Sequence, residues 1–176
     1  MHKFFWIPAV CMLVGLSAFR FIETPTSTAK EVITQDSSFV SPLVIYGSYV
    51  FKRENCGNCH SGWSYTMVPL GGELKKHTDA WHYQHLLDPS SISAYSGMPA
   101  YPHLHKQDLD MKVLAEQIEE KKKSTLVFPA GFEEKAAEIL LEDANKMAKG
   151  LEEAGIKQDD LAKKEVLAVI AYLQSL

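Results

Sequence analysis

The chain is poor in cysteine, with Cys11, Cys56 and Cys59 as its three examples in 176 residues. Three cysteines at these spacings do not make the disulfide framework that holds small secreted domains together. The chain also lacks an excess of basic residues, because 18 lysines and arginines face 22 acids and the net charge is −4. Nucleic-acid-binding proteins carry basic patches, so this composition argues against a nucleic-acid partner.

Charged residues are also missing from residues 4–19, a run bounded by Lys3 and Arg20. At about 1.5 Å per helical residue, the run extended to residue 22 nearly crosses a hydrocarbon core of about 30 Å. We therefore expect one N-terminal transmembrane helix, an uncleaved anchor over residues 1–23. A cleaved signal peptide is the alternative, and the small residues at 27–29 would supply its cleavage site.

Residues 24–42 are rich in Thr and Ser and have no periodicity, so they are predicted to form a tether. Apolar residues then recur at helical spacing over residues 43–55, which predicts a helix there. Ser41 can cap this helix, and Pro42 suits its first turn. A second helix is expected over residues 79–87, capped by Thr78. The remaining pattern predicts helices over residues 109–122, 132–149 (with Gly150 near its end) and 160–176. The sequence thus predicts an all-α domain over residues 43–176, whose last part is a helical extension.

Cys56 and Cys59 belong to a Cys-Gly-Asn-Cys-His motif that ends at His60. Two thiols three positions apart on a helical turn can each form a thioether to one vinyl group of the same porphyrin, and the next histidine is placed as the proximal iron ligand. One such motif predicts one covalent haem c, which in bacteria is attached on the outer side of the cytoplasmic membrane. A zinc site is the alternative, and His82 with His85 could supply its other two ligands.

Met98 is the best candidate for the sixth iron ligand. A glycine precedes it and a proline follows it within residues 96–102, which favours an extended loop that presents the thioether opposite His60. His/Met ligation raises the reduction potential relative to two histidines, which suits an electron carrier. Pro69 is a further candidate, because its carbonyl could accept a hydrogen bond from the His60 ring, although a simple turn is also compatible. The other candidate ligands are Met67, His77, His82, His85, His103, His105 and Met111.

Three stretches together resemble the mono-haem cytochrome c subunit, subunit II, of cbb₃-type cytochrome c oxidases. Residues 47–56 resemble the helix that leads into its haem motif, and residues 79–89 resemble its Trp-His-x-x-His-Leu-x-x-Pro helix. Residues 96–104 resemble its Met-Pro-Ala-Tyr-Pro-x-Leu ligand loop, and residues 169–174 are similar to its closing helix. The chain departs from the family in a shorter segment between the haem motif and Trp81.

The resemblance implies a class I-like cytochrome c domain whose first and last helices cross, and Gly47 and Tyr172 are the candidates for that crossing. It also implies an electron-transfer subunit that takes electrons from another c-type cytochrome and passes them to a haem–copper catalytic subunit, where oxygen is reduced. Three alternatives remain: the cytochrome c subunit of a nitric oxide reductase, a free-standing anchored shuttle, and a structural subunit that uses zinc.

Overall fold

The computed structural model describes residues 40–60, 76–124 and 127–176 of the chain. Within these three ranges the regular secondary structure is helical and no strand is formed. One isolated antiparallel bridge pairs Asp108 with Lys164. The expectation of an all-α fold is therefore confirmed for the described residues.

The chain divides into two units, Met1–Thr34 and Gln35–Leu176, and the described residues all belong to the second. The predicted anchor at residues 1–23 and nearly all of the predicted tether at 24–42 lie outside the described residues. Among the helices that the structure does describe, none has the length and apolar character needed to cross a membrane.

Helix α1, Pro42–Arg53, begins where the sequence predicts. The Ser41 hydroxyl accepts a hydrogen bond from the Leu43 N–H at 3.2 Å, which caps the first turn. Pro42 lies in that turn, where its missing N–H costs no intrahelical hydrogen bond. The helix ends at Arg53 and not at Asn55, because Asn55 adopts a left-handed φ of 56°.

Short helices α2 (Gly57–His60), α3 (Asp79–Leu87) and α4 (Pro89–Ile92) follow. The Thr78 side chain accepts from the Trp81 N–H at 3.2 Å and caps α3, as predicted. The proline after Asp88 disfavours helical geometry at Asp88 and so ends α3. The extended Asp88 then caps α4 by accepting from the Ser90 N–H at 3.1 Å.

Helix α5, Met111–Lys122, begins slightly later than the predicted residue 109, because the Asp110 side chain caps it by accepting from the Lys112 N–H at 2.8 Å. Helix α6 spans Phe132–Glu153, so the prediction that it ends near Gly150 is wrong. Its end is a Schellman motif in which Gly155 adopts a φ of 92° and the Ile156 N–H donates to the Leu151 carbonyl at 2.9 Å.

The predicted helix over residues 160–176 is divided into the 3₁₀ turn η2, Leu161–Lys163, and helix α7, Glu165–Ser175. Lys164 between them is extended and pairs with Asp108. The first N–H groups of α7 donate to a loop far away in sequence, Glu165 to Gln107 and Val166 to Leu104, each at 3.0 Å. Tertiary hydrogen bonds therefore set where α7 begins.

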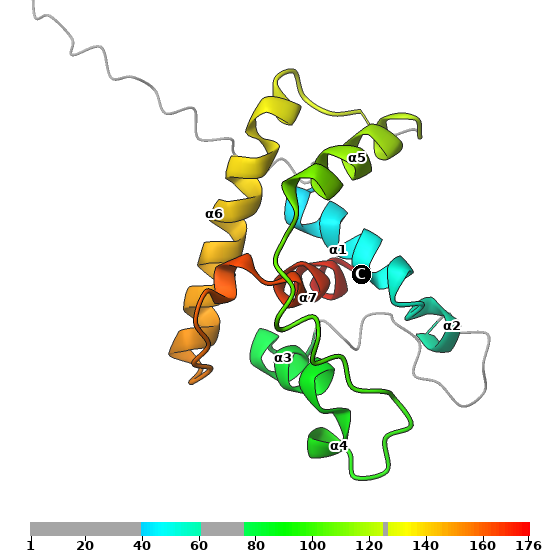
Figure 1. Cartoon of the computed structure of the whole chain (residues 1–176), viewed down its shortest axis with the longest axis vertical. Coiled ribbons are helices and arrows are strands. Elements are labelled where there is room, and N and C mark those ends of the chain that lie inside the picture. The colour runs from blue at the N-terminus through cyan, green and yellow to red at the C-terminus, as the bar shows by residue number, and fades with distance from the viewer. Residues whose placement is uncertain (1–39, 61–75, 125–126) are drawn as a thin grey trace, which may run out of the picture. The chain divides into compact units, whose positions relative to one another are not determined.

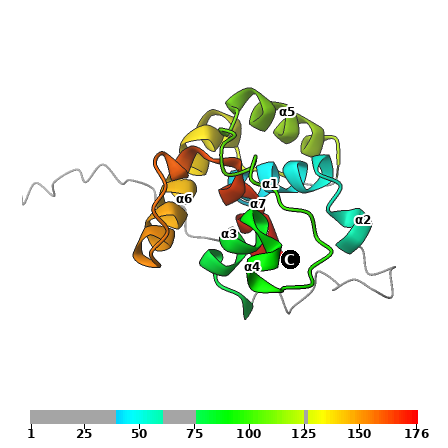
Figure 2. The ribbon, with the colours of Figure 1, turned by 60° about the horizontal axis from the view of Figure 1, so that its bottom comes forward.

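Helices α1 and α7 cross at the centre of the domain, α5 and α6 also pack on α1, and α3 packs on α7 (Figures 1 and 2). A Cβ atom placed on Gly47 would lie 1.9 Å from the Ala168 carbonyl oxygen and 2.8 Å from Tyr172 Cβ. The expected crossing at Gly47 and Tyr172 is thereby confirmed. The most deeply buried large side chains gather around it: Leu43, Ile45, Tyr46, Val50, Leu104, Leu114, Leu140, Leu151, Val166, Leu167 and Ile170.

A partly buried ion pair ties the end of α1 to the start of α7. The Arg53 guanidinium donates to both carboxylate oxygens of Glu165, at 2.8 and 2.6 Å. Glu165 is only 3% exposed, and it also accepts from the Tyr46 hydroxyl at 3.0 Å. Bidentate pairing with further hydrogen bonds satisfies a carboxylate that burial would otherwise destabilise. The pair fixes the helix end that leads directly into residues 56–60.

Candidate haem site

One largely apolar cavity brings together three of the predicted haem-binding residues, Cys56, His60 and Met98. They come from the turn after α1, from α2 and from the loop after α4, segments that are separated in the sequence. The rest of the cavity wall consists of side chains from α1, α3 and α7: Phe51, Trp81, His82, His85, Leu86, Val169 and Leu173. The cavity therefore lies where the crossing of α1 and α7 meets α3.

Cys56 is positioned by the C-terminal cap of α1. The Cys56 N–H donates to the Phe51 carbonyl at 3.2 Å, and the Asn55 N–H donates to the Lys52 carbonyl at 3.1 Å. These two bonds form a Schellman motif, with Asn55 as its left-handed residue. Asparagine accepts this conformation better than most residues with a side chain. The backbone of the haem motif thus starts from a fixed direction relative to α1.

We expect Asn55→Val to lower the free energy of unfolding by about 1–2 kcal/mol, because a β-branched side chain is strained at positive φ. Asn55→Gly is the matched control and should change stability by only a few tenths of a kcal/mol, since glycine adopts this conformation readily. Urea unfolding followed by circular dichroism measures both values. Equal stabilities for the two variants would show that the left-handed geometry at Asn55 is not needed.

Helix α2 carries the second half of the motif. The N–H groups of Cys59 and His60 both donate to the Cys56 carbonyl, at 3.2 and 3.1 Å. Cys56 is half-buried, whereas Cys59 is exposed and does not belong to the cavity wall that the described residues form. Burial, with a smaller contribution from the Glu54 carboxylate, raises the pKa of the Cys56 thiol. In the described structure the Cys56 thiol is therefore neutral at pH 7.

Met98 lies in a loop that is anchored at several points. Its N–H donates to the Ser96 hydroxyl at 3.2 Å, and the Tyr101 N–H donates to the Leu86 carbonyl of α3 at 2.8 Å. Further along, the Leu104 carbonyl accepts from the first turn of α7. These bonds hold the half-buried Met98 side chain in the cavity wall.

The other ligand candidates differ in position. His103 pairs with Glu54 at 3.1 Å, His105 packs edge-on against Tyr83, and Met111 is on α5. His82 and His85 do line the cavity, and His77 stacks on Trp81. The candidates Met67 and Pro69 lie outside the described residues, so the predicted contact between Pro69 and His60 stays a prediction.

From the sequence, His82 and His85 of α3 are candidate zinc or iron ligands, or surface or propionate-side hydrogen-bonding groups, with no role resolved among these. The i, i+4 spacing of Trp81 and His85 was the available signal, because such residues share a helix face. Their rings stack almost in parallel, with centroids 4.6 Å apart and an interplanar angle of 15°. Burial lowers the pKa of His85, and the nearby His82 and His60 lower it further, so its imidazole is neutral at pH 7.

These residues fit a c-type haem. The cavity wall offers a thiol, an imidazole and a thioether from the predicted motifs, surrounded by apolar side chains. Among the described residues no three His, Cys, Asp or Glu side chains converge as metal ligands, so those residues do not form the zinc cluster considered as an alternative. A thiol, an imidazole and a thioether are donor types that could hold a haem.

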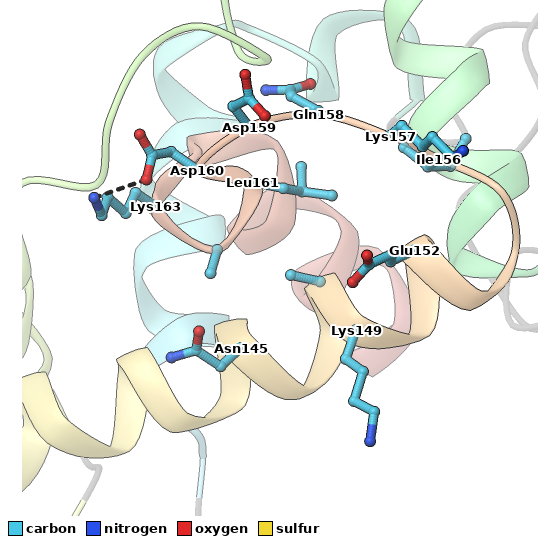
Figure 3. A pocket seen from close by; sticks show the side chains of 12 residues that line it. Asn145, Lys149, Glu152, Ile156, Lys157, Gln158, Asp159, Asp160, Leu161 and Lys163 are labelled. Carbon is cyan, nitrogen blue, oxygen red and sulfur yellow. Dashed lines mark hydrogen bonds and ion pairs between the residues drawn. The ribbon is translucent and has the colours of Figure 1, made fainter.

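A second, larger hollow lies between the C-terminal half of α6 and residues 156–163 (Figure 3). Its wall carries both signs of charge, and Asp160 pairs there with Lys163 at 2.9 Å. Cys56, Cys59, His60 and Met98, the predicted haem-binding residues that the structure describes, do not line it. Both groups of the ion pair are mostly exposed, which is typical of a solvated surface hollow.

The sequence matches the family described as cytochrome c oxidase, mono-haem subunit/FixO, over residues 69–176. The matched part includes α3, the Met98 loop and α7, and it begins after the haem motif at 56–60. No curated protein matches the chain significantly. The family description implies a cytochrome with one haem that associates with other oxidase subunits. This chain belongs to the family of mono-haem subunits of cytochrome c oxidase.

Proposed function

We propose that this chain relays single electrons from another c-type cytochrome to the haem–copper catalytic subunit of a cbb₃-type oxidase. It does so from the outer side of the bacterial cytoplasmic membrane, held there by an anchor at residues 1–23. The observation that carries the proposal is the cavity in which Cys56, His60 and Met98 meet. The match to a family of mono-haem cytochrome c oxidase subunits supports the oxidase part of the proposal.

The proposed ligands are Cys56 and Cys59 for covalent attachment and His60 and Met98 for the iron. A bound haem supplies a one-electron redox couple at this site. His60 offers a ring nitrogen, and Met98 offers a soft thioether that favours the reduced state and raises the potential. With both His60 and Met98 on the iron no position would be left for oxygen, so oxygen reduction would take place on another subunit.

The cavity wall also favours a high reduction potential. Phe51, Leu86 and Val169 give the space between the proposed ligands an apolar wall. An apolar surrounding disfavours the more highly charged oxidised state and also raises the potential. The ion pair of Arg53 with Glu165 keeps the α1 end, and hence the motif, in a fixed position. The described residues thus favour rapid electron exchange without rearrangement of the protein.

The test is to isolate a tagged chain from membranes of its own host in mild detergent, with Met98→Ala beside the wild type. We expect a many-span haem–copper subunit to co-purify with both. The variant should lose the sulfur–iron charge-transfer band and its potential should fall by at least about 60 mV, a tenfold change in the electron-transfer equilibrium. Oxidase turnover should slow by a similar factor. Met111→Ala, a half-buried methionine on α5, is the control and should keep the band.

Three results would contradict the proposal. Haem that acid–acetone extracts would rule out covalent attachment through Cys56 and Cys59. Isolation as a lone, fully functional cytochrome would favour an anchored shuttle. Co-purification with a nitric oxide-reducing subunit that holds non-haem iron would favour the nitric oxide reductase.

A further inference from the structure

Three aromatic rings form a stacked column beside the cavity. His77 stacks on Trp81 with centroids 3.8 Å apart at 13°, and Trp81 stacks on His85 at 4.6 Å and 15°. His77 is exposed, whereas Trp81 and His85 are half-buried and line the cavity. The base of α3 is held by Gln174 of α7, which donates to the Asp79 carboxylate at 3.0 Å. The plane of the His85 imidazole is therefore fixed by its neighbours.

The Nδ1 atom of His85 is buried and has no hydrogen-bond partner among the described residues. A buried polar atom without a partner costs about 1–3 kcal/mol, and such atoms are rare in native proteins. Trp81 stacks on the ring and His85 belongs to the cavity wall, so a group bound in the cavity is the candidate partner. In the tautomer that carries its proton on Nδ1 the atom donates, and its partner is then a ligand with a hydrogen-bond acceptor.

Haem carries such acceptors, namely two propionate carboxylates on the edge of the porphyrin opposite its vinyl groups. The described cavity wall contains no lysine or arginine that could pair with a carboxylate. Cys56, His60 and Met98 are already used by attachment and iron ligation, which leaves Trp81, His82 and His85 as the polar groups of the wall. A carboxylate in a partly apolar site needs a hydrogen-bond donor.

We propose that His85 is a further haem-binding residue, whose Nδ1–H donates a hydrogen bond to a propionate carboxylate while Trp81 holds the imidazole plane. This inference rests on the proposed haem site. This hydrogen bond would also affect the reduction potential of the haem. The positive end of the N–H dipole weakens the field of the carboxylate at the iron, which disfavours the oxidised state. Removal of the donor should therefore lower the reduction potential.

The experiment uses the mature haem-loaded protein, with His85→Phe and His85→Gln beside the wild type. In ¹⁵N-labelled reduced wild type, an imidazole N–H resonance protected from solvent exchange should appear, and it should vanish in both variants. The potential should fall in His85→Phe and recover in part in His85→Gln, whose amide can donate. His105→Leu is the control: His105 is also buried with unpartnered nitrogens among the described residues, but it does not line the cavity. Its potential should match the wild type.

Failure of this inference and failure of the haem site are distinguishable. Protein without covalent haem, or without the charge-transfer band in the wild type, would sink the haem site itself. An intact band together with an unprotected His85 N–H and equal potentials in wild type and His85→Phe would overturn the propionate contact alone. Loss of the low-spin spectrum in His85→Phe would make His85 an iron ligand and would also overturn it. If His85→Phe does not incorporate haem, the imidazole N–H resonance of the wild type and the reduction potential of His85→Gln still test the propionate contact.

Discussion

Replacing Gly47 with alanine is expected to lower the free energy of unfolding by about 3 kcal/mol, at the upper end of the cost of overpacking a core. The new Cβ would lie 1.9 Å from the Ala168 carbonyl oxygen and 2.6 Å from its carbon, which are backbone atoms of α7. A side chain could rotate away, but a helix backbone cannot do so without shifting the whole helix. The gain in helix propensity from glycine to alanine, about 1 kcal/mol, does not offset this clash.

The same substitution should reduce the yield of mature haem protein, because the C-terminal cap of α1 leads into Cys56 and α7 contributes Val169 and Leu173 to the cavity. Gly150→Ala is the matched control in α6, where no described atom lies within 4 Å of the added Cβ. It should stabilise the protein by about 0.5–1 kcal/mol through helix propensity alone. Urea unfolding followed at 222 nm measures both. Stabilisation by both substitutions would mean that α1 and α7 do not touch at Gly47.

His105 should make the protein sensitive to mild acid. Its side chain is 5% exposed, and among the described residues neither ring nitrogen has a hydrogen-bond partner. Burial, with a smaller contribution from His103, lowers the pKa of His105 to about 4. The unfolded chain binds a proton near pH 6.5 while the folded protein does not, so the free energy of unfolding falls as the pH drops from 6.5 towards 4. The loss from this single group amounts to about 3 kcal/mol.

His105→Leu should remove that slope, and it should not lower stability at pH 7.5, because an apolar side chain has no unsatisfied polar atoms to bury. Unfolding curves at pH 7.5, 6, 5 and 4.5 give the comparison. The difference between variant and wild type should grow with falling pH. His103→Leu is a suitable control because His103 is much more exposed and pairs with Glu54. Parallel pH profiles for wild type and His105→Leu would show that another group causes any acid sensitivity.

The local parts of the fold could be predicted because their causes lie within a few residues. Ser41 and Thr78 cap the helices they were expected to cap, and Asp88 with the following proline ends α3. Hydrogen bonds from a side chain to the next turn depend on sequence spacing alone. Where a helix boundary depends on distant partners, prediction was wrong, as at the start of α7, where Glu165 and Val166 donate to the loop of Leu104 and Gln107.

The candidate haem motif at residues 56–60, the loop around Met98 and the family of the chain could all be recognised from the sequence. Only tertiary packing brings Cys56, His60 and Met98 to one cavity. Trp81 and His85 of α3 line the same cavity. Sequence spacing fixes only which atoms are neighbours within one helical turn. Packing of α7 against Gly47 fixes which distant turns can approach each other.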